Sequence, residues 1–269
     1  MTIDTTKNHP LTYYKLKPSF SQERFWVLHN LDPDKPTYTI SKVFRFSGAF
    51  NLKAWKKSLR ELVERHEILR TTFTFEERLY QRIASDQQCD FDYVELSEDL
   101  VEEAIKSYIQ QPFDLESSNP LFQVKVIKTG MDTHYFLMNI HHILCDGPSL
   151  GILLEDLFRL YSSNSQQIKA ELPPLEIQFA DFAEWERNTV ESDQSTSLEF
   201  WKENLKGAPS KVDFNKHGES QKVGTGGKTT RFRVPSELQQ AVKSVSKANR
   251  TTLFTTFITA FTILIYKYT

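Results

Sequence analysis

The sequence predicts a protein that mixes strands and helices in layers, of the α/β or α+β class, arranged in two parts. Segments with helical spacing of apolar residues occur among pairs of strand-like segments joined by short turns. A polar, glycine-containing stretch at 211–228 then precedes a renewed strand-helix-helix pattern. The 269 residues, with 20 phenylalanines, provide material for a large packed interior.

The first half of the chain predicts a strand, a helix, a hairpin and a second helix. Residues 39–48 alternate enough to form a strand, and an amphipathic helix with Asn51 as its N-cap follows and ends near Arg65. Residues 69–84 favour a hairpin, and 101–114 favour a helix closed by its Gln-Pro pair. The apolar face of the helix behind Asn51 consists of Leu52, Trp55, Leu59, Leu62 and Val63.

The middle of the chain predicts a second hairpin, a third helix and a loop. Residues 120–130 and 134–146 form the hairpin strands around Thr-Gly-Met-Asp, and helical spacing returns from Leu150 to Tyr161. The polar stretch 162–174 is expected to be an exposed loop.

The last third predicts helices at 179–188 and 198–207, the polar linker at 211–228 and a strand-helix-helix pattern at 229–257. Part of the linker, 223–230, ends in Gly-Lys-Thr like a phosphate-binding loop. Lys222 stands where that loop requires glycine, and no buried strand precedes it, so a nucleotide site is rejected.

An apolar helix is predicted at the C-terminal end of the sequence. Apolar residues from Leu253 to Tyr266 fall at helical spacing behind Thr251, a possible N-cap. The stretch falls short of the ~20 residues of a membrane-spanning helix, so a buried helix is expected. It has no stop signal before the last residue, which favours a chain cut out of something longer.

Composition favours a cytoplasmic protein that binds neither nucleic acid nor a membrane. The net charge of −2 gives no electrostatic reason to expect either partner. Cys89 and Cys145 make no disulfide framework and fit a reduced compartment. Residues 1–20 lack the apolar core of a signal peptide.

The candidate site is His-His-Ile-Leu-Cys-Asp-Gly at 141–147, where an apolar strand turns into a helix. Burying two imidazoles and a carboxylate is costly unless each has a partner or a task. Strand alternation directs His141 and His142 to opposite sides, which makes zinc chelation by both awkward, so no metal is expected. The alternative of two satisfied core histidines is disfavoured by the tandem pair and the Asp-Gly that follows.

A functional interpretation gives each residue of this cluster a separate task. A neutral imidazole can take or hold a proton from an attacking amine or hydroxyl. Asp146 can fix local geometry by pairing with an arginine. Arg65 and Arg70 are candidates, the sequence does not decide between them, and a partner beyond this sequence stays open. Gly147 lets the backbone turn sharply and approach a substrate. No serine occupies a nucleophile elbow, so direct attack of a bound nucleophile on a bound acyl donor is favoured.

Four stretches, in order around the histidine cluster, resemble motifs of nonribosomal peptide synthetase condensation domains. Residues 141–147 match the His-His-x-x-x-Asp-Gly signature of the chloramphenicol acetyltransferase-like superfamily that includes them. Residues 19–33 resemble the family's opening motif, and Arg-His-Glu-Ile-Leu-Arg-Thr-Thr-Phe at 65–73 is similar to the second motif nearly residue for residue. Residues 112–128 and 179–188 resemble two more.

The resemblance implies two similar lobes in a V, with the active-site histidine at their junction and a tunnel through both. Residues 1–175 would form the N-terminal lobe. Residues 176–269 would supply connecting helices, a linker and the beginning of a truncated second lobe. The family's later motifs have no counterpart before Thr269, so an N-terminal portion of the domain is expected.

The resemblance also implies the roles of individual residues. His142 would be the catalytic residue that positions or deprotonates the acceptor amine, and Gly147 would line the reaction centre, where its N–H could help a developing oxyanion. Structural parts in the active site would fall to His141, Asp146, Arg65 and Arg70.

The implied reaction is amide formation between a donor acyl or peptidyl thioester and an acceptor aminoacyl thioester. Both would arrive on 4′-phosphopantetheine arms of an upstream donor and a downstream acceptor carrier protein, with no cofactor bound by the chain itself. Adjoining synthetase domains, such as an adenylation domain, would be further partners. Two alternatives stay open: a free-standing acyl-CoA-dependent acyltransferase, and a non-catalytic module that docks carrier proteins.

Overall fold

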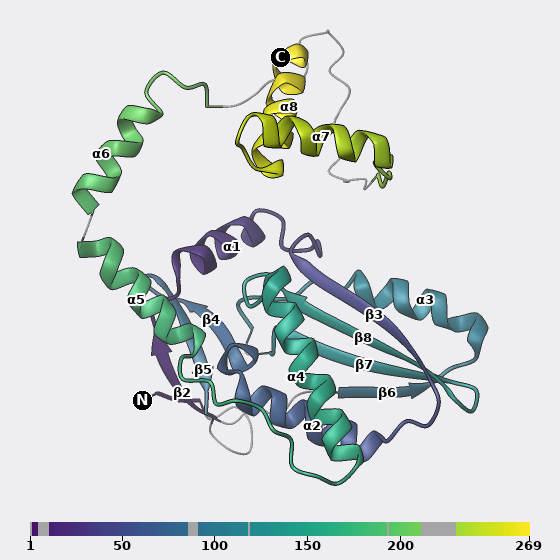
Figure 1. The fold of residues 1–269 in the computed structure, drawn as a ribbon. Helices are drawn as coiled ribbons and strands as arrows, with labels where there is room; N and C mark the ends of the chain where they lie inside the picture. The colour runs from purple at the N-terminus through teal and green to yellow at the C-terminus, as the bar shows by residue number, and fades with distance from the viewer. Residues whose placement is uncertain (1, 5–10, 86–90, 118, 193, 211–229) are drawn as a thin grey trace. The chain divides into compact units, whose positions relative to one another are not determined.

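The computed structural model describes residues 2–4, 11–85, 91–117, 119–192, 194–210 and 230–269 (Figure 1). By internal contacts the chain divides into two compact units, Met1–Gln194 and Ser195–Thr269, which are described separately. The expected lobes at 1–175 and 176–269 stay a prediction. Cys89 and the rejected phosphate loop up to residue 229 lie outside the described residues.

The first unit contains two four-stranded sheets. One, in the order β1-β2-β5-β4, is antiparallel throughout and consists of β1 (Thr2–Asp4), β2 (Leu11–Leu16), β5 (Leu79–Ala84) and β4 (Thr71–Phe75). The predicted hairpin at 69–84 is confirmed as β4–β5. The sequence did not predict β1 and β2.

The second sheet carries the histidine cluster at the end of one of its central strands. Its order is β3-β8-β7-β6, and only the β6–β7 pair is parallel. The predicted strand at 39–48 and the predicted hairpin at 120–146 are confirmed. The strands are β3 (Thr39–Ser47), β8 (Thr133–His141), β7 (Phe122–Thr129) and β6 (Phe91–Glu95), of which the sequence did not predict β6.

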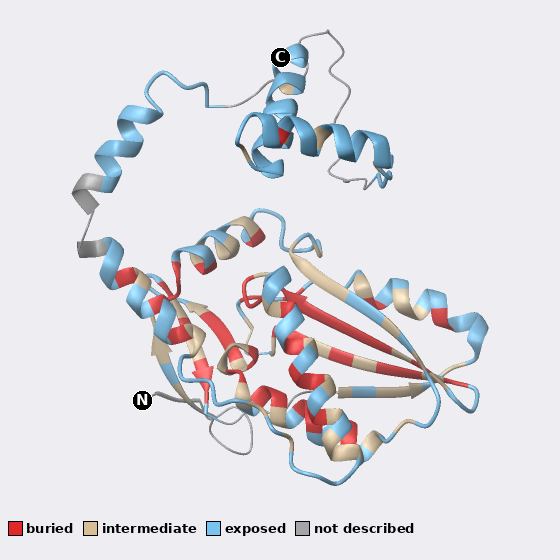
Figure 2. Ribbon diagram, viewed as in Figure 1, coloured by how far each residue is buried: buried red, intermediate tan, exposed pale blue. Residues whose placement is uncertain are grey.

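Helices cover both faces of this second sheet, and β7 and β8 are largely buried between them (Figure 2). α2 (Leu52–Arg65) and α4 (Gly147–Ser165) pack on one face, where Trp55 contacts Phe136 of β8. α3 (Glu98–Ile109) covers the other face, where Leu137 lies among its apolar residues. Alternation along β8 therefore fills two separate cores.

The helix signals in the sequence differ in how well they place the helix ends. Asn51 caps α2 as predicted, with its Oδ1 accepting from the Ala54 N–H at 3.0 Å. α4 begins at Gly147, three residues before the expected Leu150, because Asp146 caps it and Pro148 fits a first turn. It continues to Ser165, so the loop expected from residue 162 begins at Gln166.

The first unit contains two further helices, of which α1 (Phe20–Asn30) contacts the histidine cluster. It begins behind Ser19, and α5 (Phe179–Ser192) contains the predicted helix at 179–188. A short 3-10 helix, η1 (Glu67–Arg70), follows α2.

The second unit is helical in its described part. It contains α6 (Gln194–Asn204, whose first residue belongs to the first unit), α7 (Ser236–Ala248) and α8 (Leu253–Tyr268). The strand predicted just after residue 229 is not formed, because a strand needs a partner and no described segment pairs with residues 230–235. The N-cap of α8 is Thr252 rather than Thr251.

The expectation that α8 is a buried helix is wrong for the described structure. The helix packs on α7, where the hydroxyls of Ser246 and Thr256 lie 2.7 Å apart, but it has no buried residue. No helix in the described part of the chain is both long and apolar enough to cross a membrane. The exposed large side chains of α8 include Phe254, Phe257, Phe261, Leu264 and Tyr266.

The exposed apolar side chains of α8 predict that the chain self-associates, because monomers rarely expose apolar patches of this extent. Sedimentation velocity should show a sedimentation coefficient that rises with concentration. Phe261→Glu should reduce this rise, whereas Met131→Glu, at an exposed turn of the first unit, should not. A wild-type chain that stays monomeric up to high concentration would contradict the prediction.

Candidate active site

The histidine cluster lies where β8 stops being a strand. Both histidine N–H groups are held by residues that just precede the neighbouring strands. The N–H of His141 donates to the carbonyl of Leu121 at 3.0 Å, before β7, and that of His142 donates to Tyr38 at 2.7 Å, before β3. The two bonds go to opposite sides of β8, so each of the two neighbouring strands begins next to a residue that holds the N–H of one histidine.

His141 is buried and stays neutral. Its Nδ1 accepts from the Ile143 N–H at 3.1 Å, which places the ring proton on Nε2. Burial, followed by the positive charges that His29 and His142 would carry, lowers the pKa of His141 to about 3. Its ring lies edge-on to His29 at 5.1 Å and to Phe113 at 6.1 Å between centroids. This environment agrees with the structural part expected for His141, which stays a prediction.

His142 is half-buried and has different neighbours. Its ring stacks on Phe25 of α1, with centroids 4.7 Å apart and planes 20° apart. Nδ1 of His142 is buried and has no hydrogen-bond partner among the described residues. Nε2 is therefore the ring nitrogen left to meet a substrate.

Asp146 and Gly147 form the start of α4. Asp146 is exposed, and its Oδ1 accepts from the N–H of Ser149 at 2.9 Å and from the Ser149 hydroxyl. These bonds lower the pKa of the Asp146 carboxyl. Gly147 does not need a left-handed backbone, and a Cβ there would meet no side chain or more distant backbone of the described residues within 4 Å. The sharp turn expected from the sequence is therefore not what requires glycine at this position.

The ion pair expected between Asp146 and an arginine is not formed in the described part of the chain. Arg65 Nε donates to Asp156 Oδ2 of α4 at 2.9 Å, and Arg70 binds Glu67 and the carbonyl of Ala84. A capping aspartate at the surface already has donors in its own helix, so it has no need of a cation from α2.

Asp156 is the buried carboxylate that sequence reasoning missed. Besides Arg65, it binds Nε2 of His66 at 2.8 Å, and both partners come from the end of α2. Burial lowers the pKa of His66, against the opposing effect of Asp156. The sequence feature that could have identified Asp156 is its position on the apolar side of a helix, next to Leu153 and Leu157.

Cys145, inside the motif, is not a ready nucleophile. Its thiol is buried and free, and burial raises its pKa to about 12. The thiolate is the nucleophilic form of cysteine. Together with the lack of a nucleophile-elbow serine in the sequence, this favours direct transfer over a covalent acyl-enzyme.

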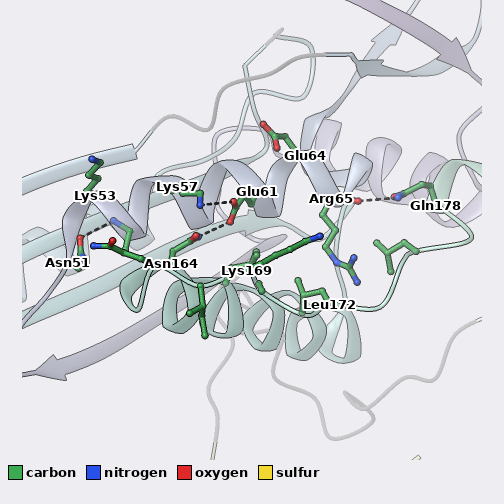
Figure 3. Close-up of a pocket in the computed structure, with 16 residues that line it drawn as sticks. Asn51, Lys53, Lys57, Glu61, Glu64, Arg65, Asn164, Lys169, Leu172 and Gln178 are labelled. Atoms are coloured by element: carbon green, nitrogen blue, oxygen red, sulfur yellow. Dashed lines mark hydrogen bonds and ion pairs between the residues drawn. The ribbon is translucent and has the colours of Figure 1, made fainter.

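One cavity of the first unit is not lined by the histidine cluster. It has a volume of about 1000 Å³ and lies between α2, the end of α4 and the segment 167–178 (Figure 3). Arg65 is one of its lining residues, but neither histidine of the cluster and no residue of 143–147 lines it. The chemistry predicted for the cluster is therefore not assigned to this cavity.

The fold and the site define an acyltransferase-like domain with a His-His-x-x-x-Asp-Gly turn at the end of a central strand. The family model described as "Condensation domain" matches residues 13–269, and the chain belongs to this family. Peptide bond formation is the known role of the family. The resemblance seen in the sequence is confirmed.

Curated relatives are nonribosomal peptide synthetases. The chain is 32% identical over 273 residues to one of the proteins that make up the linear gramicidin synthase of Brevibacillus parabrevis, covering 94% of the chain and 3% of the relative. It is 32% identical over 260 residues to phosphinothricin tripeptide synthetase PhsC of Streptomyces viridochromogenes, covering 93% and 24%. The chain thus spans less than a quarter of the length of either relative.

Solved structures share the fold. A four-domain nonribosomal peptide synthetase, holo-AB3403 bound to AMP and glycine, matches 96% of this chain and 20% of its own, with a TM-score of 0.79 and 22% identity. The condensation domain of the monacolin K polyketide synthase MokA matches 95% and 60%, with a TM-score of 0.73 and 20% identity. The mixed layered fold predicted from the sequence is confirmed.

The different environments of two aspartates predict different costs of removing them. Asp146→Ala should lower the free energy of unfolding by about 1 kcal/mol, because it removes one helix cap. Asp156→Ala should lower it by about 3 kcal/mol, because it leaves the part-buried Arg65 without its carboxylate. Urea denaturation of both variants measures the two losses. A larger loss for Asp146→Ala would contradict the assignment.

Burial of His141 predicts an acid-labile fold. An unfolded histidine has a pKa near 6.5, so below that pH the unfolded chain binds a proton that His141 in the folded state, with a pKa of about 3, does not. The free energy of unfolding therefore falls as the pH is lowered from 6.5 towards 3, by at most about 1.4 kcal/mol per pH unit from this residue.

His141→Gln removes this titration but keeps those of His29 and His66, whose pKa values are also lowered by burial. Urea denaturation is measured at several pH values between the ordinary pKa of a carboxyl group and that of a histidine. In this range the free energy of unfolding should change less steeply with pH for the variant than for the wild type. Equal slopes of the free energy of unfolding against pH would show that His141 binds a proton as readily in the folded chain as in the unfolded chain.

Proposed function

We propose that this chain is the N-terminal portion of a condensation domain that forms amide bonds in a nonribosomal peptide synthetase. The observation that carries the proposal is the His142 ring, which stacks on Phe25 of α1 with only Nε2 left for a substrate. Residues 1–175 would supply the first lobe, and 176–269 the connecting helices, the linker and the beginning of the truncated second lobe. Donor and acceptor would be thioesters on 4′-phosphopantetheine arms, delivered by carrier proteins beside neighbouring domains such as an adenylation domain.

The proposed step is attack of the acceptor amine on the donor thioester carbonyl. The new C–N bond forms as the C–S bond breaks, the donor's thiol leaves, and the amine loses one proton. His142 Nε2 would hold the amine or take that proton. A free amine must be neutral to attack, so holding it against the carbonyl can contribute as much as removing its proton.

The first turn of α4 would stabilise the oxyanion that forms on the attacked carbonyl. The first N–H groups of a helix have no carbonyl partner within the helix. Asp146 binds the N–H of Ser149, which leaves the Gly147 N–H at the helix start as the candidate donor. The space in front of Gly147 agrees with this role, because a Cβ there would meet no side chain or more distant backbone of the described residues within 4 Å.

A non-catalytic docking module is the second candidate. The observation in its favour is a solved structure titled as a complex of an X-domain with OxyB from teicoplanin biosynthesis, which matches 78% of this chain and 46% of its own at a TM-score of 0.68. In that protein the fold accompanies another protein in a complex. A free-standing acyl-CoA acyltransferase has no such observation in its favour.

The decisive test offers the chain two separately loaded carrier proteins and identifies the product by mass spectrometry. It is run with the 269-residue chain and with any longer protein that contains it. An amide on the acceptor carrier supports the condensation reaction. Carrier binding without any product supports the docking module, and a product from acyl-CoA alone supports the free-standing acyltransferase.

Replacing His142 predicts a large loss of amide formation with the fold intact. His142→Ala should slow the reaction by about 10²–10⁴-fold if the ring acts as a base, and by about 10²-fold if it positions the amine. His142→Gln should keep much of the activity only in the second case. His134→Gln, at the opposite end of β8, is the matched control and should keep the rate.

Circular dichroism and carrier binding check that each of these variants is folded. Full activity of His142→Ala would refute the assignment of His142, and His141 would then be the next candidate.

A further inference from the structure

One face of α1 supplies a ring to each histidine of the cluster. Phe25 stacks on His142 with a centroid distance of 4.7 Å, and His29 lies edge-on to His141 at 5.1 Å. Positions four apart share one face of a helix, so a single helix reaches both imidazoles. The opening-motif segment, at 19–33, therefore contacts the catalytic turn directly.

The plane of the His142 ring has no hydrogen bond to fix it in the described structure. Its Nδ1 is buried without a partner among the described residues, although a positioned histidine commonly donates one ring N–H to a fixed acceptor. The contact that does restrain the plane is the Phe25 face, only 20° from parallel. Offset stacking of this kind favours a defined ring orientation.

Phe25 is itself held in place on the side of β3. Tyr38 lies edge-on to the Phe25 ring, with centroids 5.7 Å apart. The carbonyl of the same Tyr38 accepts the His142 N–H at 2.7 Å. One residue thus fixes the backbone of His142 and also supports the ring that covers its side chain.

The N-terminus of α1 is clamped by α5. Arg187 of α5 donates through Nε to the Pro18 carbonyl at 2.8 Å, pairs with Glu23 at 2.6 Å and lies 3.9 Å from the centroid of the Phe20 ring. Glu186 accepts from the N–H of Phe20 at 2.9 Å. α1 is therefore a fixed support, and a change in Phe25 alone should not move it.

We propose that Phe25 is the positioning residue of His142, which holds the imidazole plane so that Nε2 faces the acceptor amine. The consequence for rate rests on the proposed condensation reaction, whereas the placement of the ring does not. The competing explanation is that Phe25 only fills space beside the apolar core, since it packs against that core as well. If Phe25 only fills space, leucine can replace it. If Phe25 orients the imidazole, only a residue with an aromatic ring can replace it.

The test compares Phe25→Leu, which keeps an apolar side chain, with Phe25→Tyr, which keeps the ring. Trp26→Leu is the matched control, because Trp26 is the next residue of α1 and stacks on Phe75 rather than on a histidine. The first readout is the NMR spectrum of the full chain with isotope-labelled histidine, in which His142→Gln identifies the His142 ring signals.

The stacked Phe25 ring should shift the His142 ring-proton signals upfield. This shift should be lost in Phe25→Leu and kept in Phe25→Tyr and Trp26→Leu. The second readout is amide formation at saturating acceptor. There Phe25→Leu should lose about 10- to 10²-fold, as expected for a misplaced reacting group, while Phe25→Tyr and Trp26→Leu retain the wild-type rate.

An unchanged His142 shift in Phe25→Leu would overturn the proposal, and so would a lost shift with an unchanged rate. If the wild-type chain forms no amide at all, the proposed function fails on that assay. The loss or retention of the ring shift then still decides whether Phe25 orients His142.

Discussion

The backbone N–H groups of His141 and His142 donate to carbonyls just before two different strands, β7 and β3, and this double attachment determines the geometry of the site. It ends β8, a central strand of its sheet, at a fixed residue, His141. The stopping point places both imidazoles beside α1. His141 is buried against His29 and Phe113, whereas His142 stacks on Phe25. A shift of one residue would exchange the two histidines.

Burial separates the chemical behaviour of two identical side chains. His141 is shielded so thoroughly that its pKa falls to about 3, and a neutral His141 adds no positive charge beside His142. Without that neutrality, two adjacent imidazoles would oppose each other's protonation. Nδ1 of His141 accepts a backbone N–H, so the buried ring also stabilises the turn that leads to Asp146.

Local patterns predicted what depends on local physics, and pairing between distant segments was predicted less completely. The hairpins β4–β5 and β7–β8 follow from periodicity and turn residues. The strand expected just after residue 229 failed, because the described chain offers it no partner. An arginine partner, left unidentified, was expected for Asp146; among the described residues Asp146 caps its own helix, whereas Arg65 pairs with Asp156. Nothing in the sequence pairs Phe25 with a histidine more than a hundred residues later.

The segments that carry the family resemblance meet in space as one connected structure. Arg187, from the segment at 179–188, holds the start of α1, and α1 in turn holds the histidine pair through Phe25 and His29. Arg65, from the second segment, holds α4 through Asp156, and α4 begins at Gly147, five residues after His142. One imidazole and one helix N-terminus are thereby fixed from two directions. A reaction that needs an amine, a carbonyl and an oxyanion donor within contact distance requires this kind of support.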